Sequence, residues 1–101
     1  MARIQKNDWG VRFEITVITA TSTVDISGAT TKQIIFEDPG GSVSTKTATF
    51  TTDGTDGKMY WDSTTSFLST AGRWKLQGYF QDANQGNRTE KTFFYVQEIL
   101  A

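Results

Sequence analysis

Hydrophobic and polar residues alternate along several stretches of this chain, and the alternation predicts β-strands. From Gly10 to Ile18, apolar side chains occupy every second position. The stretch that begins at Gly72 repeats the pattern more strongly, with Trp74, Leu76 and Phe80 in one phase. A period of two places alternate side chains on opposite faces, so each stretch should be a strand with one buried face.

Turn residues separate the other predicted strands. Asp38-Pro39-Gly40-Gly41 ends a strand that begins at Thr30, and Asp53 to Gly57 forms a second turn, because Pro presets φ for a turn and Gly accepts a positive φ. We expect Val43, Ala48 and Phe50 to point inward. The phase changes between Val43 and Ala48, which predicts a bulge, a bend or two segments of different register. The remaining predicted strands cover Val24–Ile26, Ser42–Thr52, Lys58–Asp62 and Thr89–Leu100.

The predicted elements amount to about seven short strands in one domain that spans residues 1–101. Turn signals recur every 8–12 residues or so, a spacing typical of a β-sandwich or barrel. Ser63–Ala71 lacks the strand period, and Phe67-Leu68 within it could close one end of the sandwich from a single helical turn. We expect Trp9 and Trp61 to be core residues as well. The main predicted core comprises Val11, Phe13, Ile15, Val17, Ile34, Phe36, Phe50, Trp74, Leu76, Phe80, Phe94 and Val96.

The amino-acid composition argues against several classes of function. Ten Lys and Arg residues balance eleven Asp and Glu residues, so no basic field is present to bind nucleic acid. No apolar run is long enough to cross a bilayer, and the N-terminus lacks the apolar region of a signal peptide. The chain contains no His and no Cys, which removes the most common general base and the usual ligands of transition metals. We therefore predict no enzymatic activity, no catalytic residues and no cofactor.

Three polar motifs have both a functional and a structural interpretation. Asp53 and Asp56 could contribute to a calcium loop, but such a loop needs six or more oxygen ligands, and a turn stabilised by its own Asp side chains is favoured. Glu37-Asp38 and Asp62 could form a carboxylate cluster, although all three are expected at solvated strand ends. Asn87-Arg88-Thr89 matches a glycosylation motif, for which a hairpin turn is the favoured interpretation.

The order of five segments resembles one known family. The segments Trp9–Thr16, Val24–Thr30, Lys32–Gly41, Asp53–Gly57 and Leu68–Trp74 are similar to the strands and turns of the immunoglobulin-like domain at the N-terminus of phage baseplate upper proteins. The likeness covers about residues 9–97. It implies an immunoglobulin-like antiparallel β-sandwich of about seven strands.

The resemblance also implies a function. It predicts a non-enzymatic structural component of a tailed-phage virion, in the tail, baseplate or neck, made in the host cytoplasm. The expected partners are other virion proteins and copies of the chain itself, with neither nucleic acid nor membrane. The family's baseplate members continue into coiled-coil or fibre segments and this chain stops after the domain, so a capsid decoration protein is an alternative. A carbohydrate-binding module for host attachment is another.

Four large side chains lie out of phase with the predicted core. They are Ile35, Tyr79, Phe93 and Tyr95, and they should face away from the sandwich interior. If the last two long strands pair, the aromatic members would form one outer patch. Exposed apolar patches mark contact surfaces, so these residues are the predicted protein interface.

Overall fold

The computed structural model describes residues 4–18, 23–83, 86–89 and 91–98 of the chain. This part of the chain forms eight β-strands, and none of it forms a helix that could cross a membrane. The all-β prediction is confirmed, with one strand more than expected. The strands are β1 (Arg12–Thr16), β2 (Thr31–Glu37), β3 (Val43–Thr47), β4 (Thr49–Phe50), β5 (Lys58–Asp62), β6 (Gly72–Gln81), β7 (Gly86–Arg88) and β8 (Thr92–Val96).

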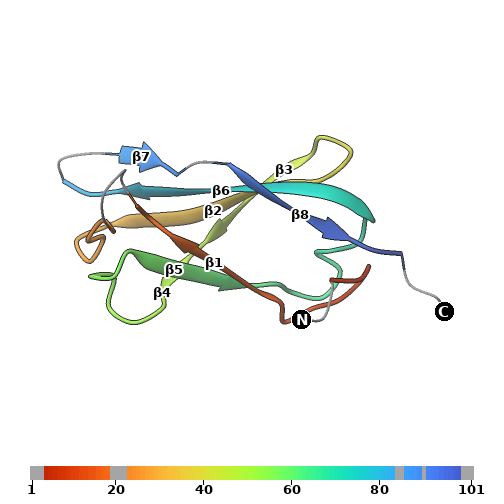
Figure 1. Cartoon of the computed structure of the whole chain (residues 1–101), viewed down its shortest axis with the longest axis horizontal. Helices are drawn as coiled ribbons and strands as arrows, with labels where there is room; N and C mark the ends of the chain where they lie inside the picture. The colour runs from red at the N-terminus through yellow and green to blue at the C-terminus, as the bar shows by residue number, and fades with distance from the viewer. Residues whose placement is uncertain (1–3, 19–22, 84–85, 90, 99–101) are drawn as a thin grey trace.

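Two antiparallel sheets pack face to face as a sandwich (Figure 1). The smaller sheet has the strand order β1-β5-β4, and the larger has the order β3-β2-β6, with β7 and β8 both paired to the far edge of β6. An immunoglobulin sandwich has strands A, B, E and D in one sheet and C, F and G in the other, to which variable-type domains add C′ and C″. Here β1, β5 and β4 take the places of B, E and D, and no described strand pairs in the place of A.

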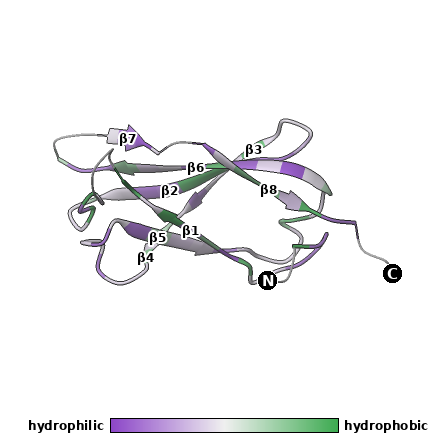
Figure 2. Cartoon of the chain, in the orientation of Figure 1, coloured by the Kyte–Doolittle hydropathy of each residue, from purple (hydrophilic) through white to green (hydrophobic). Residues whose placement is uncertain are grey.

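The long strand β6 is the centre of the larger sheet. Trp74, Leu76 and Phe80 are buried, whereas Arg73 and Lys75 are exposed. Hydrophobic and hydrophilic colours alternate accordingly along this strand in Figure 2. The strand predicted to begin at Gly72 is confirmed, and so is its inward phase.

The core follows the predicted phase closely. Nine of the twelve predicted core residues are buried, and the other three, Val11, Phe50 and Phe94, are half-buried against them. The core also contains Ile26, Ala48, Met59 and Leu68. Of these, Ala48 was expected to point inward. Met59 lies in a strand too short to show a clear period, which explains why the alternation alone did not select it.

Aromatic rings fill one end of the sandwich. Phe67 packs edge-on against Phe36, with ring centroids 5.0 Å apart, and against Trp61 at 4.8 Å. Trp61 is half-buried in this cluster, in agreement with its predicted place in the core. The neighbouring Leu68 is completely buried. The irregular segment therefore closes the end of the sandwich as expected, although it does so from turns.

The phase change in the predicted strand Ser42–Thr52 marks a crossing between sheets. β3 pairs with β2 in the larger sheet, and β4 pairs with β5 in the smaller one. The buried Ala48 lies between them. The inward placement of Val43 is wrong, because its side chain is 62% exposed opposite Glu37 on the outer face of the larger sheet.

The predictions for Trp9 and Val24–Ile26 are wrong, because both lie in loops. Trp9 is 70% exposed, because Gly10 adopts a φ of +71° and turns the chain immediately before β1. Val24–Ile26 is not a strand. Its Ile26 N–H donates to the carbonyl of Gly54, which fixes the segment as a loop.

The last part of the chain forms two strands in place of one. The predicted strand Thr89–Leu100 begins only at Thr92, and its last residues lie outside the described part. The hairpin turn expected at Asn87-Arg88-Thr89 is wrong, because Gly86–Arg88 forms the strand β7. β7 and β8 share the same edge of β6, one after the other along its length.

Candidate functional site

The four predicted interface residues all belong to the larger sheet. Ile35 alternates with buried residues in β2, and Tyr79 does so in β6. Phe93 and Tyr95 alternate with the inward residues of β8. All four therefore lie on the outer face of the larger sheet, as their phase predicts.

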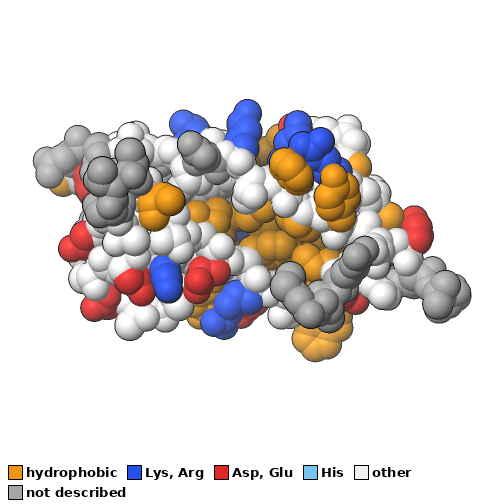
Figure 3. Space-filling model, viewed as in Figure 1, with side chains coloured by type: hydrophobic (Ala, Val, Ile, Leu, Met, Phe, Trp, Pro, Cys, Tyr) orange, Lys and Arg blue, Asp and Glu red, His pale blue; other side chains and the backbone are white. Residues whose placement is uncertain are grey.

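Phe93 and Tyr95 form an exposed aromatic pair on β8. Their side chains are 52% and 60% exposed, and their rings meet edge to face with centroids 6.4 Å apart. They lie opposite Lys75 and Arg73 of β6, and the guanidinium carbon of Arg73 lies 4.0 Å from the centroid of the Phe93 ring. Figure 3 shows this mixture of hydrophobic and basic side chains over β8. We call Phe93 and Tyr95 the β8 pair.

Ile35 and Tyr79 do not join the β8 pair. β8 pairs with β6 only from Gly72 to Leu76, and beyond that β7 occupies the edge, where Arg88 lies opposite Tyr79. The Arg88 guanidinium carbon is 4.9 Å from the Tyr79 ring centroid. The four residues thus share a face without forming one continuous patch.

A shallow cavity extends from Ile35 to Lys91, the residue just before β8. Its volume is about 210 Å³, and its lining includes Ile35, Val43, Lys75 and Lys91. Lys75 also forms an ion pair at 3.5 Å with Glu37 on the same rim. Since pockets for small molecules usually measure about 300–1,000 Å³, this hollow suits a single protruding side chain. The sequence contained a sign that Val43 faces outward, because its phase is opposite to that of the buried Ala48.

The loop from Asp53 to Gly57 is stabilised by its own carboxylates. Asp53 Oδ1 accepts hydrogen bonds from the backbone N and the hydroxyl of Thr55, at 3.0 and 2.6 Å. Asp56 Oδ1 accepts a hydrogen bond from the backbone N of Lys58 at 3.0 Å. The hydrogen bonds from Thr55 lower the pKa of Asp53 below its ordinary value. The predicted turn stabilised by Asp side chains is confirmed.

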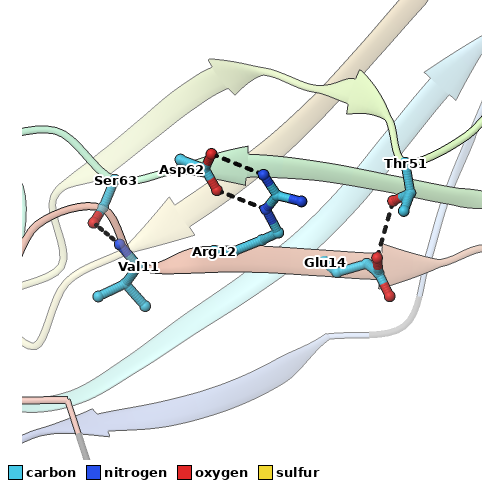
Figure 4. A network of polar contacts seen from close by, with 6 residues as sticks. All are labelled: Val11, Arg12, Glu14, Thr51, Asp62 and Ser63. Carbon is cyan, nitrogen blue, oxygen red and sulfur yellow. Dashed lines mark hydrogen bonds and ion pairs between the residues drawn. The ribbon is translucent and has the colours of Figure 1, made fainter.

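Glu37, Asp38 and Asp62 each have a partner of their own. Asp38 Oδ1 accepts hydrogen bonds from two backbone N–H groups of its turn, and Glu37 pairs with Lys75. Asp62 accepts two hydrogen bonds from Arg12, at 2.9 and 3.2 Å (Figure 4), and these lower the pKa of its carboxyl. Within the described ranges, no three residues of the types His, Cys, Asp and Glu gather where they could hold a metal.

The outer face of the larger sheet is therefore the best-supported candidate site. It offers an exposed aromatic pair, guanidinium groups over aromatic rings and a hollow the size of a side chain. Aromatic residues and Arg are the types enriched at protein interfaces. No model of a known protein family matches the chain, and no curated protein matches its sequence.

Proposed function

We propose that this chain is a non-enzymatic structural component of a tailed-phage virion that works by packing against other virion proteins and copies of itself. The tail, baseplate or neck is the leading location, and capsid decoration is the alternative. The resemblance of five segments to the immunoglobulin-like domain of phage baseplate upper proteins supports this assignment. The two-sheet sandwich is the fold that this resemblance implies.

The observation that carries the protein-contact part of the proposal is the exposure of the β8 pair. Phe93 has no polar atom in its side chain, yet it is 52% exposed. Leaving such a side chain in water forgoes the free energy that its burial would supply. Its neighbour Tyr95 and the hollow beside Lys75 extend the same surface. A partner that covers the β8 pair would also reach the hollow.

The same geometry disfavours a sugar platform. A sugar ring stacks on an open aromatic face, but Arg73 already lies over the Phe93 ring at 4.0 Å. The rings of Phe93 and Tyr95 are inclined at 82° to each other and present no common plane. Carbohydrate binding is therefore the less favoured function for this surface.

The test replaces the β8 pair by Lys, as Phe93→Lys with Tyr95→Lys. Because both side chains are exposed, the variant should fold with a melting temperature close to that of the parent. Particles made with the variant gene are purified, and the chain in them is quantified by mass spectrometry. We expect the variant to be missing from particles that contain the parent chain.

The matched control places two Lys residues on another exposed surface, as Thr65→Lys with Ser69→Lys. This control adds the same charge, and it should enter particles at the parent's level. Absence of the parent chain from purified particles would overturn the virion assignment. Normal incorporation of the β8 variant would overturn the role of the β8 pair.

A further inference from the structure

The smaller sheet ends at β1, and among the described residues only β5 pairs with that strand. Along its β5 side, the N–H of Ser63 donates to the carbonyl of Val11 and the N–H of Val17 donates to the carbonyl of Gly57, at 2.9 and 2.8 Å. In antiparallel pairs, alternate residues direct their backbone groups to the same neighbour. The odd-numbered residues of β1 therefore face β5.

The even-numbered residues Arg12, Glu14 and Thr16 consequently direct their N–H and C=O groups away from β5. Within the described part of the chain, no strand pairs with this second edge. No Pro or bulge interrupts it. Such an edge is a template on which another strand can pair.

The side chains of β1 favour a second copy of the same strand. If two β1 strands pair antiparallel around a two-fold axis with Phe13 opposite Phe13, Arg12 lies opposite Glu14 of the second copy, and the reverse holds by symmetry. Opposite charges across a strand pair stabilise it. A register centred on Glu14 would place like charges face to face. A register centred on Ile15 would place Glu14 opposite Thr16, with no ion pair.

Arg12 and Glu14 both have hydrogen-bonding atoms left for this contact. Figure 4 shows Arg12 bound to Asp62 and Glu14 bound to Thr51. A guanidinium has five N–H donors, of which Asp62 takes two, and a carboxylate accepts about four hydrogen bonds. The existing contacts hold both side chains in place at the surface, so less side-chain freedom is lost on pairing.

The hydrophobic residues that flank β1 support the same arrangement independently. Trp9 is 70% exposed before the strand, and Ile18 is 65% exposed after it. In the register centred on Phe13, the start of β1 in one copy lies beside the end of β1 in the other. Antiparallel pairing therefore places the exposed Trp9 of one copy and the exposed Ile18 of the other at the same end of the contact.

A cavity lies at the C-terminal end of β1. It has a volume of about 400 Å³, and its lining includes Val17, Ile18, Val24 and Phe80. Figure 3 also shows a hydrophobic surface in the opening between β1 and β8, which a second copy on the β1 edge would adjoin. Hydrophobic surface of this kind is the usual mark of a contact.

We propose that two copies of this chain pair through the edge of β1 that faces away from β5, antiparallel, with Arg12 of each copy opposite Glu14 of the other and Trp9 of each at the same end of the contact as Ile18 of the other. The pairing would join the two smaller sheets into one sheet across the two-fold axis. This contact is separate from the β8 pair, and it does not depend on the proposed function.

The first test measures the mass of the parent chain by analytical ultracentrifugation between about 10 μM and about 1 mM, the range in which weak interfaces associate. We expect the mass to rise toward that of a dimer. Glu14→Arg places Arg opposite Arg and should weaken dimerisation at least about tenfold. The variant Phe93→Lys, Tyr95→Lys should dimerise like the parent.

Charge exchange tests the register. Arg12→Glu places Glu opposite Glu and should also weaken self-association. A mixture of the Glu14→Arg and Arg12→Glu chains restores both opposite-charge pairs and should give a heterodimer. If Arg12→Glu proves unstable, Glu14→Gln replaces it, because this substitution keeps the Arg12–Asp62 pair and removes the ion pairs between the copies. Glu14→Gln should weaken dimerisation less than Glu14→Arg does.

Amide hydrogen exchange locates the contact. The amides of Arg12, Glu14 and Thr16 should exchange rapidly at low concentration and slow at high concentration, while the amides of β6 should not change. A parent chain that stays monomeric at 1 mM, about the upper limit of weak association, would overturn the proposal. So would a dimer that Glu14→Arg leaves intact, or one that only the β8 variant disrupts.

Discussion

The outward faces of the two sheets differ in whether their side chains have partners within the chain. On the smaller sheet, Arg12 lies 3.8 Å from the Tyr60 ring centroid and binds Asp62, and Glu14 binds Thr51. On the larger sheet, Phe93 and Tyr95 stand more than half exposed. The polar side chains on the outward face of the smaller sheet thus bind one another, and no described strand pairs with the outer edge of β1. The larger sheet instead leaves aromatic rings in water.

The difference shows that one sandwich can offer two kinds of contact. A face with exposed rings associates by burying apolar area, with little dependence on register. A free strand edge associates by backbone hydrogen bonds, and its register is set by the side chains along it. Predictions that affect one sheet and leave the other unchanged test this comparison.

The largest expected effect lies in the core that the two sheets share. Trp74→Ala should lower the free energy of unfolding by about 3–5 kcal/mol, because the buried ring leaves a cavity. The substitution also removes the hydrogen bond from Trp74 Nε1 to the carbonyl of Thr70. Urea unfolding followed by circular dichroism measures the loss. Trp9→Ala is the control and should change little at micromolar concentration, because that ring is exposed.

The next effect should be confined to the smaller sheet. Gly57 adopts a φ of +75°, and a Cβ there would lie 2.8 Å from the carbonyl oxygens of Val17 and Val24. Gly57→Ala should therefore cost about 1–3 kcal/mol, and amide exchange should accelerate in β1 and β5 more than in β6 and β8. Gly28→Ala, where a Cβ meets nothing within 4 Å, is the control. Equal acceleration in both sheets would show that they do not open separately.

The smallest effect concerns acid stability. The hydrogen bonds from Arg12 hold the pKa of Asp62 below its ordinary value of 3.8. This contribution to stability is present above that value and is lost as the pH falls through the lower pKa of the folded state. Asp62→Asn should therefore be less stable than the parent at neutral pH, and the difference in free energy of unfolding should close in acid.

Arg12→Gln should show the same closing difference, since it removes the other partner of the pair. Both variants are measured at micromolar concentration, where the chain is monomeric under the proposed weak association. A difference for Asp62→Asn that persists far below pH 3.8 would show that the amide, and not the lost ion pair, causes the destabilisation.

The sequence by itself determined the fold class and the inward phase of the strands. Lys58–Asp62 was predicted with the bounds that it has, and the strand at Gly72 with its buried Trp74 was read correctly. The period of two suffices for this, because each side chain's face follows from its neighbours along the chain. The outward direction of Ile35, Tyr79, Phe93 and Tyr95 followed for the same reason.

Tertiary structure alone decided which residues meet. Tyr79 is apart from Phe93 because β7 takes the edge of β6 beyond Leu76, and Val43 is exposed because the chain changes sheets at Ala48. Trp9 and Trp61 looked alike in sequence, yet one is exposed and the other packs against Phe36. Strand pairing joins residues far apart in the chain, and local periodicity carries no information about the register or the neighbour that results.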